Sequence, residues 1–374
     1  MRSALAIFVS AVLTLTACID RIPTTIDPSD VPAGAVMKRD APTAAASVSV
    51  VMSNLNNPRG LAWGPEGGLY VVEAGTAAVT ANCVVVPRGT SCYTGTGAVS
   101  RWWKGQQERV ATGLPSIFTT GPNDVQGPQD ISFHGRGNAY ITIGFAGPPA
   151  ARAGLGAVGA NFGTLIKLTP NGEWSVEADI SALEAATNPA GGPLDSNPYG
   201  VLAEPGRQFV TDAGGNSVFE VTANGAVSLV TTLPGTPAPP PFNQSEPVPT
   251  EVVRGPDGAL YVSTLTGAPF VAGNAAIWRV VPGSAPTVHA GGFKTITDFD
   301  WGPDGSLYVL QFASAPLFFG QPGLLIRVAP DGVRTTISSS LTNPTGVLVG
   351  PDGAIYVSNR GNVVGVGEVL RIVP

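Results

Sequence analysis

The segment Gly350-Pro351-Asp352-Gly353-Ala354-Ile355-Tyr356-Val357 is the last of six copies of one pattern, in which a turn precedes an aromatic residue followed by Val or Ile. The aromatic positions of the six copies are Tyr70, Tyr140, Phe209, Tyr261, Tyr308 and Tyr356. They are spaced by 70, 69, 52, 47 and 48 residues. The last two spacings are typical of one four-stranded blade per repeat, and the first two indicate blades with long insertions.

The composition agrees with a fold made of short strands and tight turns. The chain of 374 residues has 48 Gly and 35 Pro, and only 12% of its residues are charged. This profile argues against a helical or coiled-coil protein. The net charge is -6 and no run of Lys or Arg occurs, so nucleic acid is excluded as a partner.

The two ends of the repeat region predict how the fold closes. Residues 46–53 form a strand with no partner nearby in sequence, and residues 367–373 form the third strand of the last repeat. Pairing these segments would complete the last sheet and cover both edges. We therefore predict an all-β, six-bladed β-propeller over residues 46–374, closed by the N-terminal strand against the C-terminal strands.

The N-terminus has the pattern of an export signal. Residues 4–15 are apolar and too short to span a bilayer, and Leu15-Thr16-Ala17-Cys18 resembles the bacterial lipobox. We expect a signal peptide over residues 1–17, lipidation of Cys18 and a flexible tether over residues 18–45. The protein would then be a membrane-anchored lipoprotein of the bacterial cell envelope. The alternative is ordinary secretory cleavage with an incidental Cys.

Cys83 and Cys92 are nine positions apart in a turn-rich segment of a chain expected to be exported. This spacing predicts a local disulfide. A metal site would need further ligands, and neither His134 nor His289 lies nearby in sequence.

Several segments resemble the ScyD/ScyE family, which is named for proteins of the scytonemin-biosynthesis gene cluster. They are Asn57-Pro58-Arg59-Gly60-Leu61-Ala62, the Cys83…Cys92…Gly95-Thr96-Gly97-Ala98-Val99 segment, Asp195-Ser196-Asn197-Pro198-Tyr199-Gly200 and Asp212-Ala213-Gly214-Gly215-Asn216. The resemblance covers residues 48–374 and implies an exported six-bladed propeller, distantly similar to NHL-repeat and SMP-30/gluconolactonase-like proteins. It implies no agreed activity. One departure is Gln129-Asp130, where the family pattern has His-Asp.

Alignment of the six inner strands predicts a ring of carboxylates around the channel. The equivalent positions are Gly60, Asp130, Gly200, Glu251, Asp298 and Gly346. Packing alone is not expected to select three acids and three glycines. Converging carboxylates repel unless a cation neutralises them, so Asp130, Glu251 and Asp298 are candidate ligands of Ca²⁺ or another divalent cation.

The positions just before this ring offer candidate ligand contacts at the channel mouth, namely Arg59, Gln129 and Tyr199 together with the acids. Arg59 could also neutralise a carboxylate with no metal present. The structural alternative is that the acids accept hydrogen bonds from amides of adjacent blades. The Gly154-Leu155-Gly156-Ala157-Val158-Gly159 run lacks a βαβ context and does not indicate dinucleotide binding.

These observations leave three hypotheses for function. The first is an envelope propeller that binds a small-molecule ligand or an envelope protein on the face that carries its insertions. The second is a metal-dependent, lactonase-like hydrolase with an axial divalent cation. The third is a scaffold for an envelope complex. Whether the chain is an enzyme is left open by the sequence.

Overall fold

The computed structural model describes residues 46–135, 137–315 and 320–374, and the compact unit that contains them spans Ala45–Pro374. The predicted signal peptide, Cys18 and the tether lie outside the described residues. In the described part, no helix has the length and apolar character needed to cross a membrane.

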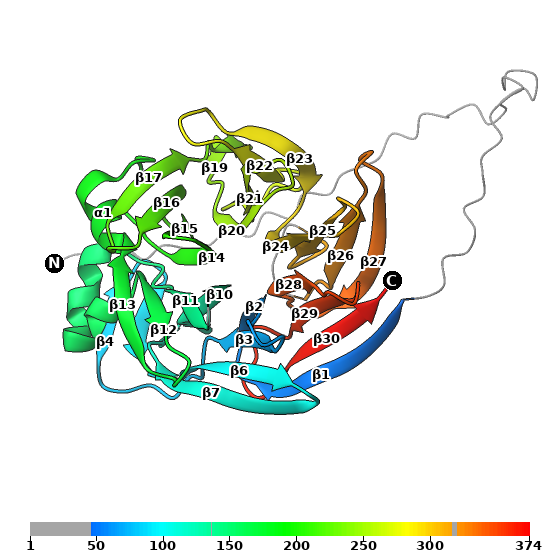
Figure 1. The fold of residues 1–374 in the computed structure, drawn as a ribbon. Helices are drawn as coiled ribbons and strands as arrows, with labels where there is room; N and C mark the ends of the chain where they lie inside the picture. Colours follow the sequence, from blue (N-terminus) through cyan, green and yellow to red (C-terminus); the bar gives the residue numbers. More distant parts are fainter. Residues whose placement is uncertain (1–45, 136, 316–319) are drawn as a thin grey trace, which may run out of the picture. The chain divides into compact units, whose positions relative to one another are not determined.

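The unit contains six four-stranded antiparallel sheets of similar construction (Figure 1). The first three sheets are formed by β2 (Pro58–Trp63), β3 (Leu69–Glu73), β6 (Gly97–Trp103) and β7 (Gln106–Leu114); by β10 (Pro128–His134), β11 (Asn138–Ile143), β12 (Thr164–Leu168) and β13 (Trp174–Asp179); and by β14 (Pro198–Glu204), β15 (Arg207–Asp212), β16 (Ser217–Thr222) and β17 (Val227–Thr232).

The other three sheets repeat this order of strands. They are formed by β20 (Pro249–Arg254), β21 (Leu260–Thr264), β22 (Ala275–Val280) and β23 (Thr287–Phe293); by β24 (Ile296–Trp301), β25 (Leu307–Gln311), β26 (Gly323–Val328) and β27 (Arg334–Leu341); and by β28 (Gly346–Val349), β29 (Ile355–Asn359), β30 (Gly367–Val373) and β1 (Ser47–Leu55). The six aromatic positions of the repeat all lie on the second strand of a sheet.

The first strand of each sheet is the innermost one, and these strands surround a common centre (Figure 1). Each contacts the first strand of the next sheet, in the order β2, β10, β14, β20, β24, β28 and back to β2. This arrangement brings side chains from all six repeats to the centre.

The predicted pairing of the two ends is present. β1 runs antiparallel to β30, with Ser47 opposite Val373 and Val50 opposite Leu370 (Figure 1). The last sheet therefore takes its outer strand from the N-terminal end of the described chain. Both segments gain a hydrogen-bonded neighbour for an edge that would otherwise be open.

The turn glycines of the repeat have the backbone conformation that their pattern predicts. Gly67, Gly258, Gly305 and Gly353 have φ values between 75° and 84°, a region that L residues with side chains rarely adopt. Each follows the Gly-Pro-Asp or Gly-Pro-Glu part of the turn between the first and second strands. The hairpin is thus specified locally in these four repeats.

Aromatic side chains join neighbouring sheets. Trp63 packs edge-on against Tyr356 with ring centroids 5.2 Å apart, and Trp301 packs against Tyr261 at 5.1 Å. His289 also packs edge-on against Tyr261, with ring centroids 4.9 Å apart, and burial lowers the pKa of His289. These contacts agree with a packing role for the tryptophans and place His289 in a ring cluster between sheets.

The insertions form structure of their own on one side of the repeats. β4 (Cys83–Val86), β5 (Gly89–Tyr93), β8 (Ile117–Thr119) and β9 (Asp124–Gln126) form an additional four-stranded sheet, and Cys83 and Cys92 form the predicted disulfide. The other insertions contain the 3-10 helix η2 (Pro149–Asn161), the α-helix α1 (Ile180–Thr187) and the hairpin of β18 (Thr236–Pro237) and β19 (Gln244–Ser245). The sequence did not predict β8 and β9, because their three-residue lengths give no periodic pattern.

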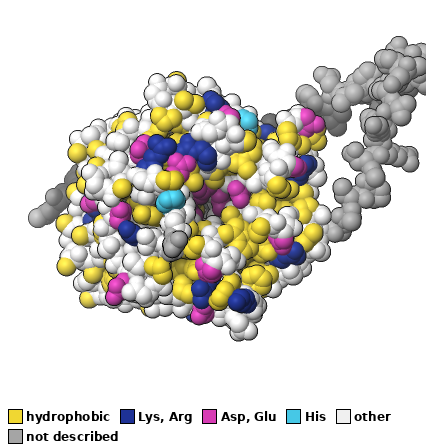
Figure 2. Space-filling view, viewed as in Figure 1, with side chains coloured by type: hydrophobic (Ala, Val, Ile, Leu, Met, Phe, Trp, Pro, Cys, Tyr) yellow, Lys and Arg dark blue, Asp and Glu magenta, His cyan; other side chains and the backbone are white. Residues whose placement is uncertain are grey.

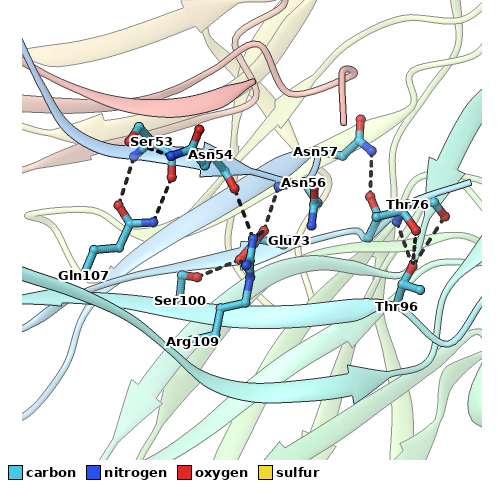
Figure 3. A network of polar contacts seen from close by, with 11 residues as sticks. Ser53, Asn54, Asn56, Asn57, Glu73, Thr76, Thr96, Ser100, Gln107 and Arg109 are labelled. Atoms are coloured by element: carbon cyan, nitrogen blue, oxygen red, sulfur yellow. Dashed lines mark hydrogen bonds and ion pairs between the residues drawn. The ribbon is translucent and has the colours of Figure 1, made fainter. Parts of the chain in front are cut away.

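An ion pair between a buried carboxylate and a partly exposed guanidinium fixes the start of the first sheet (Figure 3). Glu73 is completely buried and accepts hydrogen bonds from Arg109 at 2.8 and 2.9 Å, from Ser100 at 2.6 Å and from the backbone N–H of Asn56 at 2.7 Å. Arg109 also donates to the carbonyl of Asn54. This network ties the β1–β2 turn to β3, β6 and β7.

Candidate functional site

The main candidate site is a cavity of about 540 Å³ bounded by the insertions. We call it the large cavity. Each of the six repeats contributes to its floor the residue directly before its ring position (Gly60, Asp130 and their equivalents). These floor residues are Arg59, Gln129, Tyr199, Thr250, Thr297 and Thr345. Its walls come from the additional sheet, the segment after α1, the segment after β19 and the loop after β29. Its volume is that of a pocket for a small organic molecule.

Arg59 is held in the floor by protein acceptors. Its Nη1 donates to the carbonyl of Gly361, and its Nη2 donates to the carbonyl of Val125 at 3.1 Å. Asp124 Oδ1 lies 3.6 Å from the same Nη2. The side chain is only 8% exposed, so little of the guanidinium is left for a ligand.

The three floor threonines direct their hydroxyl protons away from the cavity. Thr345 donates to the carbonyl of Pro58 at 2.7 Å, Thr250 to that of Ile296 at 3.2 Å and Thr297 to that of Pro344 at 3.3 Å. Each of these bonds joins one inner strand to the next sheet. The hydroxyl oxygens therefore remain available to the cavity mainly as acceptors.

Four buried side-chain oxygens in the lining have no hydrogen-bond partner among the described residues. They are Gln126 Oε1, Gln129 Oε1, Asp195 Oδ1 and Asn362 Oδ1. Gln126 and Gln129 are 4% and 3% exposed. The amide of Gln126 has a fixed orientation, because its Nε2 donates to Asp124 Oδ2 at 3.1 Å. Buried acceptors without partners are rare, and a ligand with donor groups would satisfy them.

The predicted acids do not line this cavity. Asp130, Glu251 and Asp298 line a second space of about 230 Å³, the small cavity, together with Asp300 and apolar side chains. Figure 2 shows acidic side chains in the central hollow of one face, surrounded by apolar ones, a composition that agrees with this lining. Sequence neighbours such as Gln129 and Asp130 thus belong to different cavities.

The acids of the small cavity accept backbone hydrogen bonds across the sheets. Asp130 Oδ2 accepts from Val201 N at 2.8 Å, and Asp298 Oδ2 accepts from Val347 N at 2.7 Å. Asp300 repeats the contact one step along the strand, at 2.8 Å from Val349 N. Each links the inner strand of one sheet to that of the next. These contacts are those of the structural alternative considered from the sequence.

Burial gives these acids a high affinity for protons. It raises the pKa of Asp130 to about 7 and that of Asp300 to about 6. The pKa values of Glu251 and Asp298 are also raised by burial, and further by the charge of Asp130. A proton held by one of these neighbouring acids therefore relieves the repulsion for which the sequence suggested a cation.

Close packing explains the three glycines of the ring. A Cβ on Gly60 would lie 1.9 Å from Asp130 Oδ1, one on Gly200 would lie 2.4 Å from the carbonyl oxygen of Thr250, and one on Gly346 would lie 2.6 Å from that of Arg59. The expectation that packing alone would not select this mixture of acids and glycines is therefore wrong. The glycines let adjacent inner strands approach, and two acids bridge them.

The donor set of the small cavity offers little for a divalent cation. In the part of the chain that the structure describes, no group of three or more His, Cys, Asp or Glu side chains is placed to hold a metal ion. One oxygen of each candidate acid already accepts a backbone N–H. A hard cation prefers six to eight oxygen ligands, and the remaining lining of this cavity is mostly apolar. The geometry does not fit such a site.

The sequence identified part of the large cavity and missed its walls. Arg59, Gln129 and Tyr199 lie in the floor as candidate ligand contacts, whereas Asp130, Glu251 and Asp298 lie apart from them. Missed residues include Gln126, Asp195, Glu246 and Asn362. Asp195 and Tyr199 belong to one motif of the family resemblance, which was the available signal. Asp212 accepts from the N–H groups of Asn197, Gly214 and Gly215, which gives it a structural role in this turn.

Comparison with solved structures shows the fold. The chain is similar to the calcium-binding protein regucalcin from Agrobacterium tumefaciens strain C58, at 12% identity and a TM-score of 0.50, over 88% of this chain and 97% of that one. It is similar to a candidate oxidoreductase (glucose dehydrogenase) from Thermus thermophilus, at 19% identity and 0.51, over 88% and 100%. A candidate gluconolactonase matches at 12% identity and 0.51, over 88% and 92%.

These similarities show a β-propeller fold. At such low identity, the similarity to these structures shows the fold and gives no evidence of a shared activity. No family model matches the sequence, and no curated protein matches it at a significant level.

Proposed function

We propose that this protein is an exported six-bladed β-propeller, closed by the pairing of β1 with β30, that binds a small organic molecule in the large cavity. The observation that carries the proposal is the set of four unpartnered buried oxygens in the lining of one cavity. An unsatisfied buried acceptor costs about 1–3 kcal/mol, and hydrogen bonds from a ligand in the cavity would remove that cost.

The construction of the cavity supports the same proposal. All six repeats contribute to its floor, and its walls come from the additional sheet and other insertions. Motifs that carry the ScyD/ScyE resemblance supply Arg59, Asp195, Tyr199 and Gly214 to the lining. We propose membership of this family on that basis, with a ligand-binding role.

Export and anchoring form the second part of the proposal. The Cys83–Cys92 disulfide supports an oxidising compartment. Lipidation of Cys18 would hold the protein in the bacterial cell envelope, where an envelope protein is a second class of partner. Mass spectrometry of the protein from bacterial membranes tests this, with a diacylglyceryl-modified Cys18 as the expected N-terminus and an unmodified N-terminus as the contrary result.

The lactonase-like alternative has weaker support. A carboxylate-held divalent cation does not fit the small cavity, and no histidine lines either cavity described above. Gln129 occupies the position where the family pattern has His, and a glutamine side chain does not exchange protons near neutral pH. We therefore favour binding over metal-dependent hydrolysis.

A fragment screen by thermal shift tests the binding proposal. Leu265 lines the large cavity, and Leu265→Trp would fill part of it. Val288→Trp is the matched control, because Val288 is 54% exposed on the outer strand β23. We expect fragments that stabilise the unaltered protein and the control but not Leu265→Trp. Hits unaffected by Leu265→Trp would contradict the proposal.

A further inference from the structure

The charged groups of the large cavity leave two carboxylates without an ion-pair partner. The lining contains Asp124, Asp195 and Glu246 against Arg59 and Arg88. Asp124 lies 3.6 Å from Arg59 and 3.5 Å from Arg88. Among the described residues, neither Asp195 nor Glu246 forms an ion pair. An additional negative charge would therefore be unfavourable in this cavity, and a positive one favourable.

The uncharged polar groups of the lining also favour a cationic ligand, because they lack hydrogen-bond donors as partners. All four unpartnered buried atoms of the lining are oxygens, and the two unpartnered buried donors in the described chain, on Trp278 and Trp301, lie outside it. The free capacity of the lining is thus to accept hydrogen bonds. A ligand that fits must mainly donate them, and an ammonium group donates without accepting.

Asp195 and Glu246 lie close enough to influence each other. Burial raises the pKa of both, and the charge of Asp195 further raises that of Glu246, whereas Arg88 lowers the pKa of Asp195 only in part. Asp195 also keeps one oxygen buried and unpartnered. A cation between the two walls would lower both pKa values and supply the missing donor.

Aromatic rings complete the surroundings. Tyr199, Phe270 and Phe312 line the same cavity. Aromatic rings attract a cation at their faces and pack against the ring of an organic ligand. Burial raises the pKa of Tyr199, so its phenol stays protonated at neutral pH.

We propose that the large cavity binds an organic cation, whose protonated amine lies beside Asp195 and Glu246 and whose apolar part packs on the aromatic lining. This inference rests on the proposed function and narrows it to one ligand class. Gln126 and Gln129 accept further hydrogen bonds from donor groups of the same ligand.

Three probes of one shape and different charge test the inference. They are 2-phenylethylamine, 2-phenylethanol and phenylacetate, each titrated calorimetrically into the purified protein at neutral pH and low salt. We expect the amine to bind at least tenfold more tightly than the alcohol and phenylacetate to bind most weakly. Glucose serves as a donor-rich neutral probe.

Two variants locate the ammonium group. Asp195→Asn and Glu246→Gln keep the shape of the side chains, and each should weaken amine binding about tenfold while leaving binding of the alcohol unchanged. Glu173→Gln is the control, because Glu173 is exposed and lines neither cavity. Retained amine binding in both cavity variants would overturn the inference.

The outcomes separate this inference from the proposed function. Binding of the alcohol, phenylacetate or glucose at least as tight as that of the amine overturns the organic cation and leaves a small-molecule site in place. Absence of amine binding also overturns the inference. The fragment screen with Leu265→Trp then decides, independently, whether the cavity is a ligand site.

Discussion

Asp298 in β24 accepts a hydrogen bond from the backbone N–H of Val347 in β28 at 2.7 Å, and its other carboxylate oxygen accepts from the N–H of Phe299 at 2.6 Å. One side chain thus joins the inner strands of two neighbouring sheets. Asp130 forms the equivalent bridge to Val201. Two of the acids predicted to bind a metal thus act as braces between sheets.

This bridge predicts different effects for two substitutions of Asp298. Asp298→Ala leaves two buried N–H groups without an acceptor and should lower the free energy of unfolding by about 1–3 kcal/mol. Asp298→Asn keeps one acceptor, but its amide NH₂ group cannot accept from the second N–H, so it should cost less than Asp298→Ala without being neutral. Chemical denaturation of both variants measures the difference. An unchanged stability of Asp298→Ala would contradict the bridge.

Asp130 predicts a pH dependence of stability. Its pKa is raised to about 7 in the folded state, against an ordinary value of 3.8. The folded state therefore binds this proton more tightly than the unfolded state does. Proton binding thus adds stability that is fully present below about pH 4 and is lost as the pH rises to about 7. The same direction applies to Glu251 and Asp298, which face Asp130.

The comparison that checks this is the free energy of unfolding of the unaltered protein and of Asp130→Asn between about pH 4.5 and pH 8. We expect the stability of the unaltered protein to fall relative to that of the variant up to about pH 7, with little further change above it. Parallel curves would contradict the assigned pKa shift.

The Glu73–Arg109 pair predicts a large loss of stability from one substitution (Figure 3). Arg109→Met removes the cation from a carboxylate that is completely buried, and should cost about 3 kcal/mol. Arg327→Met is the comparison, because it removes the cation from Asp304, a carboxylate that is exposed to water. A loss no greater than that of the comparison would contradict the role of the network.

The disulfide predicts a local effect on the walls of the large cavity. Cys83 and Cys92 are nine positions apart, so their replacement by Ser should destabilise the additional sheet by about 2–3 kcal/mol. Hydrogen exchange should become faster in residues 83–93 and 117–126 and remain unchanged in β20–β23. Equal acceleration throughout the chain would show that the sheet does not open separately.

Calcium should not stabilise the protein. A cation present at about one hundred times its dissociation constant adds about 2.7 kcal/mol to the stability of the folded state. Because the acids of the small cavity are used by backbone amides, we expect the melting temperature to be the same with chelator and with excess Ca²⁺. A clear increase with Ca²⁺, abolished in Glu251→Gln, would restore the metal-dependent alternative.

The sequence predicted the repeat well because each hairpin is specified locally. Gly353 and its equivalents fix the turns, and the aromatic residue and the β-branched residue after it mark the second strand. The pairing of β1 with β30 followed from counting strands. The sequence left two roles open for Asp130 and Asp298 and gave no role to Gly60, because these roles depend on how closely the inner strands approach.

The walls of the large cavity were beyond prediction for a different reason. They come from insertions with no period, and Gln126, Asp195 and Glu246 meet only because these segments fold over the same face. Short strands such as β8 and β9 are defined by their partners in the sheet and have no signal of their own.

The most direct test of a ligand site in the large cavity is a crystal structure of the protein soaked with the fragments that raise its melting temperature. The account predicts density for a fragment over Arg59, Gln129 and Tyr199, within hydrogen-bond distance of at least one unpartnered oxygen of the lining. Fragments bound only elsewhere, with the large cavity containing water alone, would contradict it.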